Sequence, residues 1–172
     1  MKWMKLPAIV RCLTLLSVCC VLPLAGAKEK DQAQVPDVSL ESLSFGPSVN
    51  EADLDPKALA GKVVILDAWG VNCGPCIALL PDLQRMAKSG EKKGLVVIGV
   101  ERQNSSKDAI LAVLKKARVT YPVVSGGSIG VDFAGLPHAA VYGVDGKLRW
   151  HGSPNDDGFK RAVREALREV ER

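Results

Sequence analysis

Two cysteines separated by two residues, Cys73 and Cys76, are the side chains in this sequence best suited to covalent chemistry. The segment Cys73-Gly74-Pro75-Cys76 follows an apolar run and precedes a run with helical periodicity, so it lies where a strand passes into a helix. A helix start presents unpaired N–H groups and a partial positive charge, and both stabilise a thiolate. We therefore expect Cys73 to ionise readily and attack a disulfide, and the shielded Cys76 to resolve the mixed disulfide.

The same spacing suits two other uses, a zinc site and a structural disulfide. Structural zinc requires four ligands, and after residue 27 the sequence offers no third cysteine and only His138 and His151 as histidines. A structural disulfide that closes so short a loop contributes little stability. We therefore favour a redox-active dithiol that uses no metal and no other cofactor.

The elements around the dithiol are predicted from the hydrophobic pattern. Apolar runs rich in β-branched residues indicate buried strands, apolar spacings of three and four indicate amphipathic helices, and Asp145-Gly146 indicates a hairpin turn. In chain order we expect a short strand-like opening (35–40), a helical turn (54–61), a strand (62–69), a helix (76–89), a strand (95–100), a helix (106–117), a short strand (121–124), a hairpin (139–144 with 147–150) and a helix (159–170). This order predicts an α/β fold, a three-layer sandwich with a central mixed β-sheet.

The first 27 residues predict a targeting segment that does not belong to the fold. Basic residues precede an uncharged run from Cys12 to Leu24, and Ala25-Gly26-Ala27 supplies the small residues of a cleavage site. Because the run is shorter than the roughly 20 residues that span a bilayer, we expect a cleaved signal peptide (1–27), with an uncleaved membrane anchor as the alternative. We expect residues 28–34 to be a polar spacer, residues 35–172 to be one domain, and the protein to be exported, for example to the periplasm.

The charge distribution argues against nucleic-acid binding. The chain has 23 basic and 19 acidic residues, but three of the basic residues and none of the acidic ones lie in residues 1–27, which leaves a net charge of +1 for the rest. Near the C-terminus basic and acidic residues alternate, as they do on a solvated helix face. A nucleic-acid footprint would require basic residues clustered on one face.

From about Val35 to Val170 the sequence resembles the thioredoxin superfamily, and within it the exported TlpA/ResA-like thiol–disulfide oxidoreductases. The stretch 67–76 resembles the thioredoxin active-site segment, with Asp67 and Trp69 ahead of the dithiol, and Gly135-Leu136-Pro137 resembles the cis-proline loop. The resemblance implies an α/β thioredoxin-like fold with Cys73, Cys76 and Asp67 as catalytic residues. Asp67 would be a buried proton acceptor for Cys76, with its pKa raised by burial.

The resemblance also assigns a substrate-binding surface. The cis-proline loop implies that Leu136 and Pro137 contact the backbone of a bound substrate. Trp69 would either contact the substrate or pack in the core. His138 follows the proline where a threonine is common in the family, and a cationic imidazole there would stabilise the Cys73 thiolate.

Two further positions depart from the thioredoxin pattern. Asn72 stands where a tryptophan usually precedes the first cysteine, so we expect altered substrate contacts. Gly99 falls, without gaps, where thioredoxin carries the lysine that accompanies the buried aspartate. The pKa of Asp67 should therefore be raised by burial alone.

The resemblance implies a reductant of exported proteins, acting in cytochrome c maturation or periplasmic thiol reduction and recharged by a membrane electron carrier of the DsbD/CcdA type. Gly-Pro between the cysteines favours a reductant, whereas Asn72 and His138 favour an oxidant. The expected partners are protein thiols and disulfides, with no nucleic acid and with a membrane only through an uncleaved leader.

Two alternative functions remain open at the level of the sequence. A thiol peroxidase of the peroxiredoxin type is one, because the opening 35–40 resembles peroxiredoxin starts. A copper-binding chaperone of thioredoxin fold is the other, because soft thiolates suit Cu(I).

Overall fold

The computed structural model of the protein describes residues 35–50 and 54–170. These residues belong to one compact unit, Ala33–Arg172. The predicted signal peptide or anchor (1–27) and the predicted spacer (28–34) lie outside the described residues. Within the described part of the chain, no helix is both long enough and apolar enough to cross a membrane.

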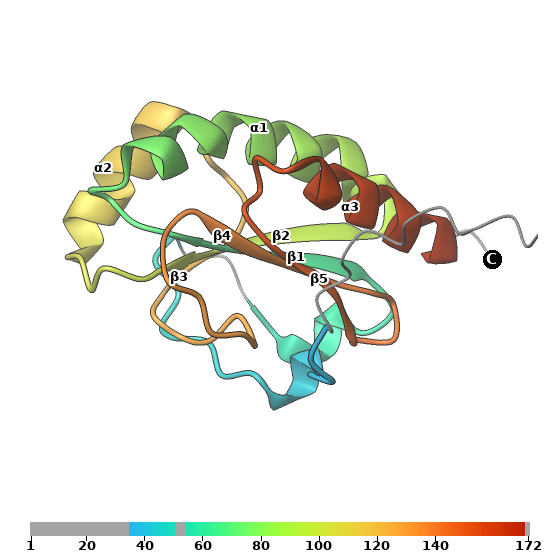
Figure 1. The fold of residues 1–172 in the computed structure, drawn as a ribbon. Helices are drawn as coiled ribbons and strands as arrows, with labels where there is room; N and C mark the ends of the chain where they lie inside the picture. Colours follow the sequence, from blue (N-terminus) through green and yellow to red (C-terminus); the bar gives the residue numbers. More distant parts are fainter. Residues whose placement is uncertain (1–34, 51–53, 171–172) are drawn as a thin grey trace, which may run out of the picture. The chain divides into compact units, whose positions relative to one another are not determined.

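Five strands form the mixed sheet that the sequence predicts, in the order β3-β2-β1-β4-β5 (Figure 1). β1 pairs in parallel with β2, and β2 with β3, whereas β4 runs antiparallel to both β1 and β5. The strands are β1 (Val63–Trp69), β2 (Leu95–Glu101), β3 (Val123–Ser125), β4 (His138–Tyr142) and β5 (Leu148–Gly152).

The central strand β1 is buried along its whole length, which explains its continuous apolar sequence. Successive side chains of a strand point to opposite faces of the sheet. Ile65 and Trp69 belong to the core that includes residues of the α-helices, whereas Leu66 and Ala68 belong to the core on the other face. The intervening Asp67 therefore faces the helices.

Three α-helices cover one face of the sheet (Figure 1). They are α1 (Gly74–Gly90), α2 (Lys107–Ala117) and α3 (Asp157–Val170), and a short 3-10 helix, η3 (Glu91–Lys93), follows α1. A serine caps α2: Ser106 Oγ accepts a hydrogen bond from Ala109 N–H at 3.3 Å. α3 buries Phe159, Ala162 and Ala166 at the spacing of an amphipathic helix.

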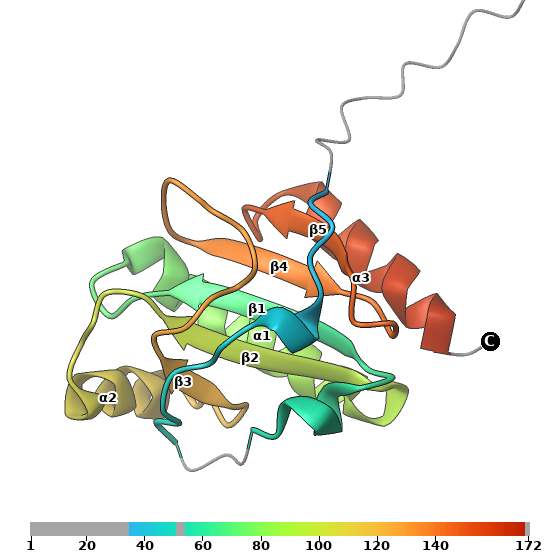
Figure 2. The same ribbon diagram turned by 90° about the horizontal axis from the view of Figure 1, so that it is seen from below.

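The opposite face is covered by irregular chain and two 3-10 helices (Figure 2). These helices are η1 (Leu40–Ser42) and η2 (Pro56–Leu59), and the loop 126–137 between β3 and β4 lies on the same face. The opening 35–40 is not a strand, since it makes only an isolated bridge, from Ser39 to Lys147. The three layers are therefore a helical layer, the sheet, and a layer of loops and short helices.

Candidate active site

Cys73 and Cys76 lie at the start of α1 and are joined by a disulfide bond. Cys73 is the N-cap residue of the helix, and its Sγ accepts a hydrogen bond from Cys76 N–H at 3.3 Å. Pro75 lies in the first turn, where its missing N–H leaves no helical hydrogen bond unmade. The helix start thus provides the N–H group and the partial positive charge that stabilise a thiolate at Cys73.

The two cysteines differ in their access to solvent. Cys73 keeps 9% of its surface exposed, whereas Cys76 keeps 0%. The residues around Cys73, namely Asn72, Gly74 and Pro75, are exposed. A partner protein that docks on this rim therefore reaches Cys73 and not Cys76.

Asp67 is a fully buried carboxyl group on the helix-facing side of β1. Among the described residues neither of its carboxyl oxygens has a hydrogen-bond partner. Burial raises the pKa of Asp67 to about 7, because an ionised carboxylate loses its hydration there. A group with this pKa can accept and return a proton near neutral pH, which is what the role implied by the family resemblance requires.

Gly99 stands directly opposite Asp67 in the pairing of β1 with β2. A Cβ atom on Gly99 would lie 3.1 Å from Nε1 of Trp69 and 3.4 Å from a ring carbon of Tyr121. Both aromatic residues are buried, so they fill the space that a longer side chain at position 99 would need. No ammonium group therefore accompanies Asp67 from this position. The full burial of Trp69 favours packing over substrate contact.

Tyr121 is a buried neighbour of this cluster that is not predicted from the sequence. Its hydroxyl has no hydrogen-bond partner among the described residues. Burial raises the pKa of Tyr121 well above its ordinary value, and the charge of Asp67 raises it further. Tyr121 therefore stays protonated, so the two groups do not compete as anions.

The peptide bond between Leu136 and Pro137 is cis, as predicted. In the antiparallel pairing of β1 with β4, His138 stands opposite Ala68. Pro137 therefore lies beside the end of β1 from which the chain continues to Cys73. Leu136 and Pro137 are half-buried, so part of the loop remains open to a partner at the same end of the sheet as the dithiol.

His138 has other neighbours than the cysteines. Its ring stacks on Phe133 with the ring centroids 4.9 Å apart, and its Nε2 lies 3.2 Å from Nδ1 of His151. Because it stands opposite Ala68, it shares the face of the sheet that points away from the α-helices. Burial, and secondly His151, lower the pKa of His138. The ring is therefore mostly uncharged near neutral pH and supplies little positive charge to Cys73.

Two further side chains of the site follow β2 and are not predicted from the sequence. Gln103 accepts a hydrogen bond from the backbone just ahead of the dithiol, and the buried Glu101 holds the loop that carries Gln103. The available signal was positional: β1 and β2 are parallel, and their carboxyl ends lie at the same edge of the sheet. A polar residue directly after the second buried strand therefore lies near a dithiol that follows the first. Phe133 and His151, the neighbours of His138, could not be predicted in this way, because they come from a loop and from an edge strand.

The fold and the dithiol together define a class, the thioredoxin-fold thiol–disulfide oxidoreductases, in which a Cys-x-x-Cys pair stands at a helix start. The AhpC/TSA family profile matches residues 32–148, and the chain belongs to that family.

Parts of the chain are similar in sequence to known proteins. NHL repeat-containing protein 2 of Gallus gallus is 39% identical over 96 residues, which are 55% of this chain and 11% of that protein. The thioredoxin-like protein YneN of Bacillus subtilis is 27% identical over 124 residues, 71% of this chain and 68% of that protein. The chain thus spans only about a tenth of the NHL repeat-containing relatives that it matches.

Solved structures share the fold at low identity. A thiol:disulfide interchange protein of the thioredoxin family from Chlorobium tepidum superposes with a TM-score of 0.65 at 21% identity, covering 80% of this chain and 99% of that one. A secreted disulfide oxidoreductase of Mycobacterium tuberculosis, homologous to DsbE of E. coli, superposes with a TM-score of 0.57 at 19% identity, covering 70% and 95%. These likenesses show a thioredoxin-like fold.

Proposed function

We propose that the protein is an exported thiol–disulfide oxidoreductase that reduces disulfides in other exported proteins. The observation that carries the proposal is the asymmetry of the dithiol: Cys73 caps α1 and keeps some exposure, whereas Cys76 is completely buried. Thiol–disulfide exchange needs this division between an attacking thiolate and a resolving thiol.

The reaction proceeds in two exchanges. The Cys73 thiolate attacks one sulfur of the substrate disulfide, forms a mixed disulfide, and releases the other substrate sulfur as a thiolate that takes up a proton. Cys76 then loses its proton and attacks Cys73 Sγ, which releases the second substrate thiol and forms the Cys73–Cys76 disulfide. Two electrons pass to the substrate, and the oxidised dithiol is the product state. Asp67, with a pKa of about 7, is the proposed acceptor of the Cys76 proton.

Two features support the reducing direction. Gly74-Pro75 between the cysteines matches the pairing found in reducing thioredoxins, and His138 is mostly uncharged near neutral pH because its pKa is lowered. Continued turnover then requires a donor of two electrons, for which a membrane carrier of the DsbD/CcdA type is proposed. Cytochrome c maturation or general periplasmic thiol reduction are the proposed roles.

Export is supported by the sequence and by one relative. The first 27 residues have the pattern of a targeting segment, and after them the chain retains only the two cysteines of the dithiol, as suits an oxidising compartment. The Mycobacterium tuberculosis relative is a secreted protein.

The test is insulin reduction with dithiothreitol as electron source. We expect Cys73→Ser to lower the rate to that of dithiothreitol alone, because the attacking sulfur is lost. Cys76→Ser should also lose turnover. Incubated with insulin after dithiothreitol has been removed, the reduced variant should accumulate a mixed disulfide, since Cys73 still attacks and no free thiol resolves the intermediate. Mass spectrometry of the intact protein detects that adduct. An active Cys73→Ser variant, or an adduct on Cys76 in that variant, would refute the proposed roles.

A thiol peroxidase is the second candidate, favoured by the match to the AhpC/TSA family. Peroxide consumption by the reduced protein distinguishes the two activities. A one-cysteine peroxidase would keep consuming peroxide as Cys76→Ser with dithiothreitol present, whereas the exchange mechanism predicts no turnover above the uncatalysed rate.

A copper-binding chaperone is the third function considered. Among residues 35–50 and 54–170, no group of three or more histidine, cysteine, aspartate or glutamate side chains is arranged to hold a metal ion. The described part of the chain therefore provides no observation in favour of this candidate.

A further inference from the structure

Glu101 is a fully buried acidic side chain at the end of β2, and the exchange mechanism does not use it. Its Oε1 accepts hydrogen bonds from Gln103 N–H at 3.0 Å and from the Ser105 hydroxyl at 2.8 Å. Its Oε2 accepts one from Ser105 N–H at 3.2 Å. Burying a carboxylate is costly unless hydrogen bonds compensate it, and here both oxygens are compensated. Glu101 therefore fixes the loop 102–105 against the end of β2.

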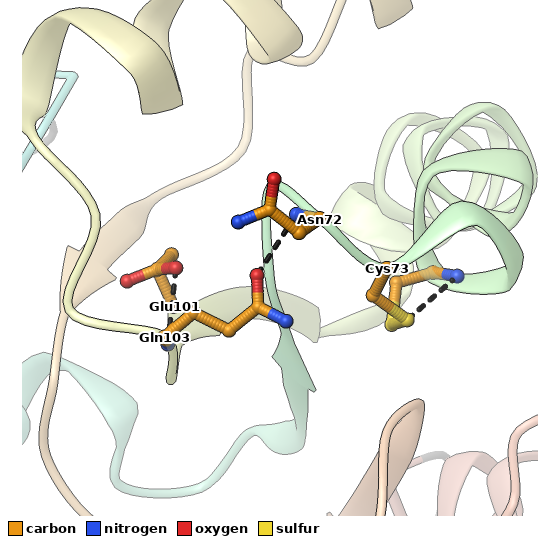
Figure 3. The surroundings of a disulfide bond; sticks show 5 residues. Asn72, Cys73, Glu101 and Gln103 are labelled. Atoms are coloured by element: carbon orange, nitrogen blue, oxygen red, sulfur yellow. Dashed lines mark hydrogen bonds between the residues drawn. A yellow bond between two sulfur atoms is a disulfide. The ribbon is translucent and has the colours of Figure 1, made fainter.

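The fixed loop directs Gln103 toward the segment that precedes the dithiol (Figure 3). Gln103 Oε1 accepts a hydrogen bond from Asn72 N–H at 2.8 Å. The same side chain occupies the space in which a Cβ atom on Gly70 would stand. The carbonyl of Gly70 in turn accepts Cys73 N–H at 3.1 Å. An unbroken series of contacts therefore connects Glu101, through Gln103, to the residues that hold Cys73.

The other end of the Gln103 amide is also turned toward the site. Figure 3 shows its nitrogen on the side of the side chain that faces the disulfide. An amide N–H on that side presents the positive end of its dipole to the sulfur. The direction of this dipole matters in the reduced protein, where Cys73 carries charge, and much less in the disulfide.

We propose that Gln103 is a positioning residue for Cys73: its amide oxygen fixes the segment 70–72, and its amide nitrogen favours the thiolate over the thiol. Glu101 acts one step further away, by holding the loop that presents Gln103. The proposal rests on disulfide exchange at Cys73, and it is independent of whether the protein reduces or oxidises its substrates.

The assignment predicts changes in two measurable quantities, the pKa of the Cys73 thiol and the equilibrium with glutathione. Loss of the Gln103 amide should raise the pKa of the Cys73 thiol by about half a unit, because the positive end of the amide dipole no longer faces the sulfur and the segment 70–72 loses its hydrogen bond. Because the reduced form alone is weakened, the equilibrium with glutathione, measured at a pH well above the pKa of Cys73, should shift about threefold toward the protein disulfide, the fold-change that half a pKa unit represents.

The experiment compares the full chain with Gln103→Met and Gln103→Glu. The pKa of Cys73 is measured from the rate of iodoacetamide alkylation across pH, and the redox equilibrium from glutathione titrations. Methionine keeps the length of the side chain but loses the hydrogen bond from Asn72 N–H and the amide dipole. Glutamate keeps the oxygen that accepts Asn72 N–H and replaces the amide nitrogen by a charged oxygen, so it should raise the pKa of Cys73 further than methionine does.

Gln84→Met is the matched control. Gln84 on α1 also links two elements, because its Oε1 accepts Thr120 N–H at 2.7 Å and its Nε2 donates to Thr120 Oγ1 at 3.0 Å. We expect this variant to leave the pKa of Cys73 and the glutathione equilibrium unchanged, even if its unfolding midpoint falls. An unchanged alkylation profile in Gln103→Met, or an equal shift in Gln84→Met, would overturn the assignment. Wild-type insulin reduction, measured alongside, tests the proposed function separately.

Discussion

At the scale of single residues, the carboxyl group of Asp67 links folding to pH. Burial raises the pKa of Asp67 to about 7 in the folded protein, whereas an aspartate in the unfolded chain titrates near its ordinary value of about 3.9. Between these values the folded state binds more protons than the unfolded state. The contribution of this residue to stability is therefore complete below pH about 4, decreases as the pH rises toward 7, and is lost above it.

Asp67→Asn should remove this pH dependence. Well above pH 7 we expect the variant to exceed the wild type in unfolding free energy by about 4 kcal/mol, because the cost of an ionised buried carboxylate disappears. The same variant should reduce insulin roughly 10- to 100-fold more slowly, because Cys76 loses its proton acceptor. Urea unfolding of the oxidised proteins at pH 5 and pH 8 measures the first effect. If the difference in unfolding free energy between the wild type and the variant were the same at pH 5 and at pH 8, a raised pKa of Asp67 would be contradicted.

At the scale of elements, the pairing of β1 with β2 sets what can stand beside Asp67. Gly99→Ala should destabilise the protein by about 1 to 3 kcal/mol, because the new methyl group is forced against buried aromatic atoms of Trp69 and Tyr121. Thermal unfolding measures the loss. Gly135→Ala is the control, since a Cβ atom there meets no heavy atom within 4 Å. Equal unfolding midpoints for the two variants would mean that Trp69 and Tyr121 accommodate the methyl group without loss of stability.

Strong local signals explain which elements were predictable. β1 and β2 are buried on both faces and so show continuous apolar runs, and the turn of the β4–β5 hairpin contains Gly146 at a φ of +72°, which glycine adopts readily. Signals that depend on tertiary contacts were not readable. The opening 35–40 has a strand-like pattern, but its apolar side chains Val38 and Leu40 pack in the loop layer instead. β3 begins only at Val123, because Pro122 before it has no N–H to donate to a neighbouring strand.

The candidate site likewise contains some residues that can be recognised from the sequence and others that cannot. The cysteines and Asp67 were recognisable because their spacing, or their presence in an apolar strand, is unusual. Nothing in the sequence distinguishes Gln103 from any other polar loop residue. Its importance arises only from the parallel register of β1 and β2, which brings it to Asn72. The face on which His138 lies likewise depends on its pairing with β1, which the sequence does not specify.

At the scale of the whole molecule, the redox state of one dithiol and the stability of the fold are linked by a thermodynamic cycle. The difference in unfolding free energy between the oxidised and reduced proteins equals the difference in disulfide-forming free energy between the folded and unfolded chains. A fold that favours the disulfide makes a reductant, and its oxidised form is then the more stable one. A fold that favours the dithiol makes an oxidant and reverses the order.

We therefore expect the oxidised protein to be the more stable form, by about 2 kcal/mol, the amount that separates a thioredoxin-like potential from that of an ordinary dithiol. Urea unfolding with and without excess dithiothreitol measures the difference, and the Cys73→Ser, Cys76→Ser double variant controls for effects of the reductant on the fold. The glutathione equilibrium must give the same free energy by an independent route. A reduced form more stable than the oxidised form would identify the protein as an oxidant, and it would do so while leaving the exchange chemistry at Cys73 intact.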